Sequence, residues 1–274
     1  MKTKLSLLLF LLLISFAFAY AQSVDTIEVF STKMNKNIKN VVVLPKGYNK
    51  SDGKKYPVIY LLHGHGGNYE TFVKSTRKSL PQDVTTLDVI AVCPNGENSW
   101  YWDSPVNPAS QFETYVSKEL VNYIDKNYNT IVSPKGRAIT GFSMGGHGSL
   151  WLGINHPDIF GACGSMSGGV DIRPFPNNWD MKRHLGIYKE NPDVWDNHTV
   201  ITQLDKIEPE TLSIIIDCGK DDFFYKVNEE LHKEMLYRNI QHDYIIRPGA
   251  HTHTYWNNAL DYQLVFFRKF FDKN

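Results

Sequence analysis

The 274-residue sequence lacks several features that mark common classes of protein. Its three cysteines, Cys93, Cys163 and Cys218, are scattered, each in or beside an apolar run. Such a set is no disulfide framework, so we interpret them as small core residues and leave one bridge open. Basic and acidic residues both number 29, which gives a formal net charge of +0. A basic surface for nucleic acid or for an anionic membrane is therefore not expected.

Long apolar runs are scarce except at the N-terminus. Two lysines precede an almost unbroken apolar stretch at residues 5–16, and the small residues Ala19 and Ala21 follow at the expected cleavage positions. This order is typical of a secretory signal peptide, and the stretch is shorter than a comfortable membrane span. We predict a secreted or periplasmic protein cleaved after Ala21, with an uncleaved anchor as the alternative. Residues 22–274 would remain (274 − 21 = 253), a length that suits one α/β domain.

Short apolar runs alternate with helical patterns along the rest of the chain. The expected strands cover residues 26–32, 38–44, 56–62, 87–93, 137–142, 160–166, 212–218 and 243–247. The expected helices cover residues 112–128, 144–155, 226–238 and 256–271. Strands that are apolar throughout fit a mostly parallel sheet buried on both faces, and the alternation predicts a doubly wound α/β fold. Residues 167–209 interrupt this alternation, and we predict a lid or binding loop there.

One motif carries most of the chemical information. Residues 141–145 read Gly-Phe-Ser-Met-Gly and follow an expected strand directly, with an expected helix after them. In this G-x-S-x-G pattern the glycines allow a sharp turn that presents the serine at the end of the sheet. A glycine-rich turn with a surface serine is the simpler alternative. In its strand-to-helix context, the motif predicts Ser143 as the nucleophile of an α/β hydrolase.

A serine nucleophile needs a base and an acid, which follow it along the chain in this fold. His251 and His253 both lie in the loop after the last expected strand. We favour His251 because it is closer to the Pro-Gly turn. For the acid, Asp221 and Asp222 follow the preceding strand and Asp217 lies within it. Asp222 is favoured with Asp221 as the alternative, since an aspartate here could equally cap a turn.

Two backbone N–H groups are needed to stabilise the oxyanion that forms during acyl transfer. One is expected from Met144, the residue after the nucleophile. The other is expected from the glycine-rich segment 63–68 (HGHGGN), which follows an early strand. Within that segment we assign the second N–H to His65, whose imidazole need not take part.

The chain resembles the esterase family of α/β hydrolases that contains feruloyl and acetylxylan esterases, S-formylglutathione hydrolases and mycolyltransferases. The matching segments, in order, are LLHGHGGN at 61–68, NSWYWD at 98–103, FETYV at 112–116, GFSMGGHG at 141–148, CGKDD at 218–222 and PGAH at 248–251. The resemblance implies a triad of Ser143, Asp222 and His251, with the N–H groups of His65 and Met144 as the oxyanion hole. We expect no cofactor and no metal. The chain departs from the family at Ala250, often glycine, and at His253, often tryptophan.

The sequence also suggests a class of substrate. Trp100, Tyr101 and Trp102 follow a strand near the expected site, and flat aromatic faces can pack on sugar rings or on a hydroxycinnamoyl group. Core packing is the alternative for each ring. With the export signal, these residues favour an esterase that removes acetyl or feruloyl groups from plant polysaccharide. A thioesterase acting on S-formylglutathione, a siderophore-lactone hydrolase and an acyltransferase would use the same triad.

Two further alternatives lie outside serine chemistry. His63, His65, His251 and His253 form two His-x-His pairs, an arrangement that can bind a metal ion. No carboxylate motif accompanies them, so a metal-dependent hydrolase is the weaker interpretation. A non-catalytic glycan-binding protein is the other, and the intact set of Ser, Asp and His argues against it.

Overall fold

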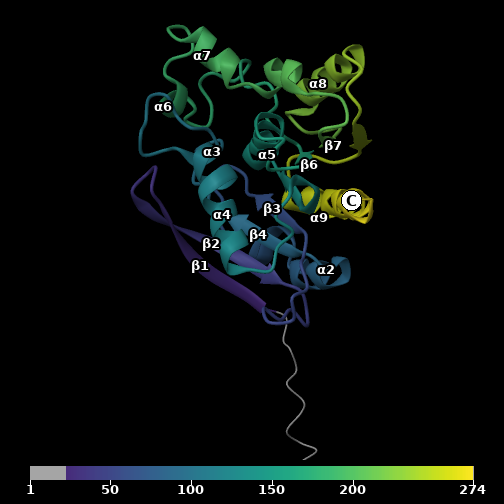
Figure 1. Cartoon of the computed structure of the whole chain (residues 1–274). Helices are drawn as coiled ribbons and strands as arrows, with labels where there is room; N and C mark the ends of the chain where they lie inside the picture. Colours follow the sequence, from purple (N-terminus) through teal and green to yellow (C-terminus); the bar gives the residue numbers. More distant parts are fainter. Residues whose placement is uncertain (1–22, 274) are drawn as a thin grey trace, which may run out of the picture.

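The protein is described by a computed structural model that covers residues 23–273. The predicted signal peptide, residues 1–21, lies outside the described residues. Eight strands form one sheet (Figure 1). They are β1 (Ser23–Ser31), β2 (Lys36–Leu44), β3 (Val58–Leu62), β4 (Ile90–Pro94), β5 (Arg137–Gly141), β6 (Ala162–Met166), β7 (Ser213–Gly219) and β8 (Asp243–Arg247). All eight expected strands are therefore present, with ends that differ by a few residues.

The order of the strands across the sheet determines where a ligand can bind. That order is β1-β2-β4-β3-β5-β6-β7-β8. The β1–β2 and β2–β4 pairs are antiparallel, and the pairs from β4 to β8 are parallel. The central strands β3, β4 and β5 are buried at every position, as their apolar sequences predict. In such sheets, ligands bind beyond the carboxyl ends of the strands, where the strand order reverses.

Helices cover both faces of the sheet (Figure 1). The helical segments are η2 (Phe72–Thr76), α2 (Leu80–Leu87), α3 (Phe112–Thr114), η3 (Tyr115–Leu120), α4 (Val121–Asn127), η4 (Pro134–Gly136), α5 (Met144–Asn155), α6 (Lys182–Leu185), α7 (Pro192–Asn197), η5 (Val200–Lys206), α8 (Tyr225–Tyr237) and α9 (His253–Asp272). Buried residues of η3, α4, α5 and α8 form the core on one face, and those of α2 and α9 the core on the other. None of the helices between residues 23 and 273 is long and apolar enough to span a bilayer.

The irregular segment 167–209 contains the short helices α6, α7 and η5. Its residues Met181, Trp195 and Val200 are fully buried, and η5 packs against α5 and α8. Figure 1 shows α6 and α7 together at the top of the molecule. These buried residues belong to the same hydrophobic core as those of η3, α4, α5 and α8. Its role as a lid stays a prediction.

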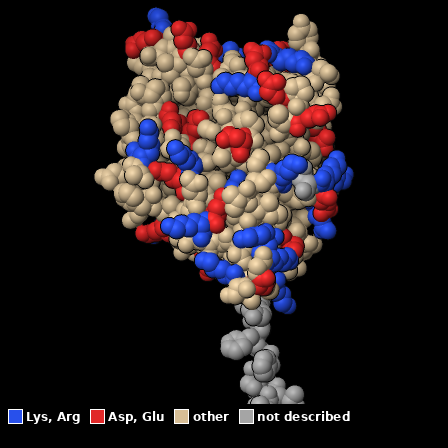
Figure 2. All heavy atoms as spheres, viewed as in Figure 1, with Lys and Arg blue, Asp and Glu red and all other residues tan. Residues whose placement is uncertain are grey.

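Outside the irregular segment 167–209, the helical segments η2, α2 and η4 were not expected from the sequence. The α2 sequence, LPQDVTTL, is short and half of its residues are polar, so it carries little periodic signal. It has a proline in its first turn, where the missing N–H costs nothing. The three cysteines are buried free thiols, as expected for small core residues. Figure 2 shows acidic and basic side chains intermixed over the viewed face, in keeping with the balanced charge.

Candidate active site

The turn between β5 and α5 holds Ser143 in an unusual backbone conformation. Its φ and ψ are 57° and −120°, a region that residues with a side chain rarely adopt. A Cβ atom at Gly141 or at Gly145 would lie 2.4 Å or 2.0 Å from the carbonyl oxygen of Leu62. Only glycine fits at these two positions, so the elbow can pack directly against the end of β3. The motif therefore forms the strand-to-helix turn that its sequence predicts.

The structure brings Ser143, His251 and Asp222 together at the carboxyl edge of the sheet. Nε2 of His251 lies 2.8 Å from Oγ of Ser143. Nδ1 of the same ring lies 2.8 Å and 3.0 Å from the two carboxylate oxygens of Asp222, whose side chain is fully buried. Because a carboxylate only accepts hydrogen bonds, this contact assigns the ring proton to Nδ1. Nε2 is then free to accept the proton of the serine hydroxyl.

The alternative acid and base candidates occupy different positions. The carboxylate of Asp221 accepts a long hydrogen bond of 3.3 Å from the N–H of Gly249, which ties the acid loop to the base loop. Nδ1 of His253 lies 2.8 Å from Oγ1 of Thr76, away from the nucleophile. Asp217 binds Arg247 and Tyr255. Among the described residues, only Asp222 contacts the ring of His251 through a carboxylate.

The predicted oxyanion loop lies beside the nucleophile. A Cβ atom at Gly64 would lie 3.2 Å from Cβ of Ser143, which places the backbone of the 63–68 segment against the elbow. In the described part of the chain, neither the N–H of His65 nor that of Met144 donates a hydrogen bond. Met144 is the first residue of α5, where backbone N–H groups have no partner within the helix. Both donors are therefore available for a substrate oxygen.

A pocket of about 500 Å³ opens over these groups. Its lining residues are Gly64, His65, Gly66, Gly67, Thr71, Ser75, Phe142, Ser143, Trp179, Phe223, His251, His253 and Trp256. Phe223 and Trp256 pack against His251, with ring centroids 4.2 Å and 4.8 Å from the imidazole. Trp179 stacks on Phe223 at 5.8 Å. The pocket therefore has aromatic walls around Ser143 and His251.

Comparison with known proteins identifies the family. The family model described as "Putative esterase" matches residues 31–267. The chain belongs to this esterase family. An acetyl esterase from Caldicellulosiruptor saccharolyticus is 24% identical over 252 residues, which cover 85% of this chain and 94% of that protein. An S-formylglutathione hydrolase from Bos taurus is 27% identical and covers 71% of this chain and 73% of its own.

Solved structures give the same result for the fold. A ferulic acid esterase superposes with a TM-score of 0.79 at 28% sequence identity, over 92% of this chain and 99% of its own. The resemblance inferred from the sequence motifs is thereby confirmed, as is the α/β-hydrolase fold. The protein is a carboxylic ester hydrolase.

The expectation that Trp100, Tyr101 and Trp102 line the substrate site of the esterase is wrong. All three side chains are fully buried, with exposed fractions of 1%, 0% and 0%, and none of them lines the pocket. The rings of Trp100 and Trp102 stack on each other at 5.6 Å, and both pack edge-on against His147. Core packing, the alternative for each ring, is what the structure shows. Trp100 does support the wall indirectly, because it packs behind Trp179 at 5.9 Å.

Tyr101 instead holds the oxyanion loop in place. Its hydroxyl donates a 3.0 Å hydrogen bond to the carbonyl of His63, and Nε2 of His63 accepts one of 2.9 Å from the N–H of Gly96. The side chain of Asn98 accepts a further hydrogen bond of 2.7 Å from the N–H of Gly66. Burial lowers the pKa of His63 to about 4, so the ring is neutral and keeps this acceptor at ordinary pH.

These contacts also bear on the metal alternative. Both nitrogens of His63 are engaged, with Gly96 N–H and with the carbonyl of Gly64 at 2.8 Å. The ring is therefore committed to the loop and not directed at His251 or His253. In residues 23–273 there is no group of three or more His, Cys, Asp or Glu side chains arranged to hold a metal ion. The donor geometry gives the metal alternative no support.

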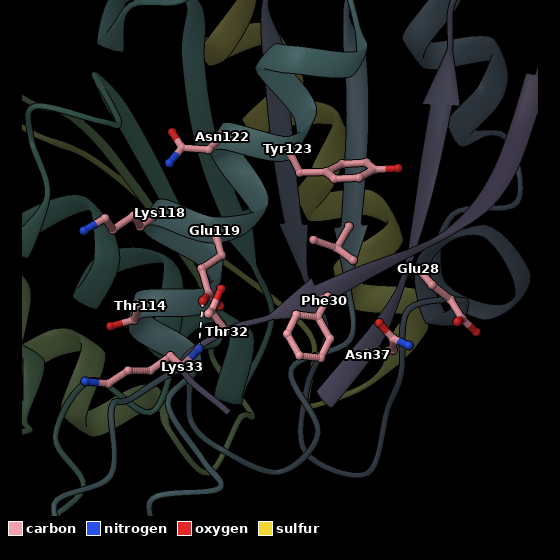
Figure 3. A pocket seen from close by; sticks show the side chains of 11 residues that line it. Glu28, Phe30, Thr32, Lys33, Asn37, Thr114, Lys118, Glu119, Asn122 and Tyr123 are labelled. Atoms are coloured by element: carbon pink, nitrogen blue, oxygen red, sulfur yellow. Dashed lines mark hydrogen bonds between the residues drawn. The ribbon is translucent and has the colours of Figure 1, made fainter. Parts of the chain in front are cut away.

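A larger hollow of about 900 Å³ lies elsewhere, between β1 and the η3–α4 helix (Figure 3). Figure 3 shows Lys118, Glu119, Asn122 and Tyr123 on the helix side and Phe30 on the strand. Glu119 is already engaged there with the backbone N–H of Lys33, at 2.9 Å. No described serine, cysteine or histidine lines this hollow, so the smaller pocket at Ser143 is the better candidate for the ester-hydrolase site.

The sequence analysis missed the walls of that pocket. Phe223 is the residue next to Asp222, Trp256 lies five positions after His251, and Phe142 precedes the nucleophile. Their closeness in sequence to the triad candidates was a usable signal. Trp179 carried no such signal, because it lies in the irregular segment 167–209, far in sequence from the triad candidates. Tertiary packing alone brings it to the pocket.

Proposed function

We propose that this protein is a secreted serine carboxylesterase that removes acyl groups, acetyl or feruloyl, from plant polysaccharide. One observation carries the proposal. The hydrogen-bonded chain from Asp222 through His251 to Ser143 ends in an aromatic pocket with two unpaired backbone N–H groups beside it. This arrangement supports acyl transfer through a covalent acyl-enzyme.

The reaction proceeds in two halves. Nε2 of His251 takes the proton of Ser143 as Oγ attacks the ester carbonyl, and the N–H groups of His65 and Met144 stabilise the negative oxygen. His251 then gives that proton to the departing alcohol, which leaves the acyl group on the serine. A water molecule enters, loses a proton to His251 and attacks the acyl-enzyme. The carboxylic acid departs as the proton returns to Oγ. Asp222 keeps the ring in the required tautomer throughout.

The walls of the pocket support a flat or small acyl group. Phe223, Trp179 and Trp256 offer apolar faces close to the nucleophile, on which a feruloyl ring can stack. The similarity to a ferulic acid esterase and to an acetyl esterase supports the same choice. The polysaccharide part of the proposal rests on export, which rests on the N-terminal leader at residues 1–21.

A thioesterase acting on S-formylglutathione is the second candidate, favoured by the similarity to the bovine S-formylglutathione hydrolase. The chemistry at Ser143 would be the same, since a thiolate replaces the alcohol as leaving group. Export from the cytosol argues against it. The two candidates differ in substrate, and a direct comparison of substrates separates them.

The test is a panel of acetyl, butyryl and feruloyl esters, acylated xylan and S-formylglutathione, assayed with the mature protein and with Ser143→Ala. We expect release of acetate or ferulate from xylan that depends on Ser143. Preference for S-formylglutathione would replace the polysaccharide proposal with the second candidate. Inactivity of the unmodified protein on every ester, or equal activity of Ser143→Ala, would refute serine catalysis. Localisation is tested separately by N-terminal sequencing of the exported protein, which should begin at Gln22.

A further inference from the structure

A second buried carboxylate lies behind the His251–Asp222 pair. Asp217, near the end of β7, is fully buried, with an exposed fraction of 0%. One of its oxygens accepts a 2.6 Å hydrogen bond from Nη2 of Arg247, and the other accepts one of 2.5 Å from the hydroxyl of Tyr255. We call these three residues the Asp217 cluster. The proposed reaction uses none of them.

The cluster connects the starting points of two loops: the acid loop, which follows β7 and carries Asp222, and the base loop, which follows β8 and carries His251. Arg247 ends β8, directly before the base loop at residues 248–252, and Tyr255 lies in the first turn of α9, directly after it. His251 is four residues from each of them. The base loop is therefore held at both ends by the same carboxylate. Asp217 itself lies five residues before Asp222, in the strand β7 that leads into the acid loop.

The ring of Tyr255 also contacts both loops. A Cβ atom at Gly249 would lie 2.4 Å from the ring, and one at Gly219 would lie 3.2 Å from it. The ring thus packs against one glycine of each loop. The backbones are joined as well, because the N–H of Asp221 donates a 2.9 Å hydrogen bond to the carbonyl of Gly249. A shift of Tyr255 would move both loops.

Arg247 has little freedom to leave the cluster. Its guanidinium lies 5.0 Å from the ring centroid of Tyr255 and 4.3 Å from that of Tyr262, and it also contacts the side chain of Asn258. All three partners belong to α9. Such stacking fixes the plane of the guanidinium in a way that a lysine could not reproduce. The cluster is thus a rigid link between β7, β8 and α9.

We propose that Tyr255 is a positioning residue for the catalytic base. Through Asp217 and Arg247 it fixes the base loop, so that Nε2 of His251 stays 2.8 Å from Oγ of Ser143. The inference rests on the proposed function, since it concerns the geometry of that reaction. A small displacement of a catalytic group lowers the rate of the chemical step without weakening the binding of substrate.

The test is Tyr255→Phe, which removes one hydroxyl and keeps the ring. For p-nitrophenyl acetate we expect kcat to fall by about 10- to 100-fold with KM almost unchanged. The rate at which a fluorophosphonate labels Ser143 should fall by a similar factor, because labelling needs the same base but no bound ester. Arg247→Lys keeps the charge without the stacked plane, and should give an intermediate loss.

Tyr115→Phe is the matched control. Tyr115 is also fully buried, and its hydroxyl is hydrogen-bonded to Asn40, at 2.8 Å and 3.0 Å, in the core beneath η3. Its loss should lower the melting temperature without changing kcat or the labelling rate. The inference is overturned if Tyr255→Phe keeps both rates, or if both variants lose activity equally. Should Tyr255→Phe not fold, unaltered rates in Arg247→Lys would overturn it instead. An unmodified protein with no Ser143-dependent hydrolysis would refute the proposed function itself.

Discussion

Replacement of Asp222 by asparagine tests the assignment of the acid most directly. The asparagine side chain would have the same shape, but its amide can donate a hydrogen bond to Nδ1 of His251 and so stabilise the tautomer with the proton on Nε2. That proton would point at Ser143, and the ring could no longer accept one. Because the side chain of Asp222 is fully buried and contacts both the ring and the N–H of Phe224 at 2.8 Å, solvent cannot take over its role.

We expect kcat of Asp222→Asn to fall by about 10³- to 10⁴-fold, the loss typical of such a change in a serine triad. This corresponds to about 4 to 5 kcal/mol of transition-state stabilisation. KM should stay close to that of the unmodified esterase, since Asp222 does not line the pocket. Steady-state hydrolysis of p-nitrophenyl acetate measures both constants.

Asp221→Asn is the matched control for this experiment. Asp221 is exposed, and among the described residues its carboxylate makes a single hydrogen bond, the 3.3 Å contact with Gly249, so its loss should leave kcat close to normal. Equal losses in the two variants, or a loss at Asp221 that exceeds the loss at Asp222, would refute the assignment.

Three further predictions concern stability and the pocket walls. Burial lowers the pKa of His63 to about 4 and that of His147 to about 3, below the ordinary 6.5. Between pH 7 and pH 5 the unfolded chain therefore binds protons that the folded chain does not. Each of the two histidines should lower the free energy of unfolding by about 2 kcal/mol at pH 5 relative to pH 7. Urea unfolding at both pH values measures this, and an unchanged free energy would contradict it. Phe223→Ala should raise KM for a feruloyl ester several-fold without changing the melting temperature, because its ring lines the pocket and is 53% exposed. Trp102→Phe should leave KM unchanged and lower the free energy of unfolding by about 1–3 kcal/mol. A raised KM in that variant would instead indicate that Trp102 contacts the substrate.

Local features were predictable from the sequence where local geometry decides them. The elbow at Ser143 depends on Gly141 and Gly145, whose missing side chains allow contact with β3, and the motif records that requirement directly. The order of Ser143, Asp222 and His251 along the chain is the one that this fold uses for a triad. The strands were found because sheets buried on both faces need continuous apolar runs.

Features that depend on packing between distant segments were not predictable in the same way. The three aromatic residues at 100–102 look alike in sequence whether they face solvent or the core. Their burial depends on His147 and on Trp179, which no local pattern places beside them. Asp221 and Asp222 are adjacent and chemically alike, and only the conformation of the loop that follows β7 determines which of them is buried beside His251.

The backbone at Ser143 has a consequence for the stability of the whole domain. A residue with a Cβ atom at φ 57° and ψ −120° carries a cost of the order of 1–3 kcal/mol, which glycine would avoid. Surrounding packing has to offset that cost in every folded molecule. Selection for stability alone would favour glycine at this position, and the hydroxyl would be lost. A serine held there is thus the residue that stability alone would not choose, and only its chemistry accounts for it.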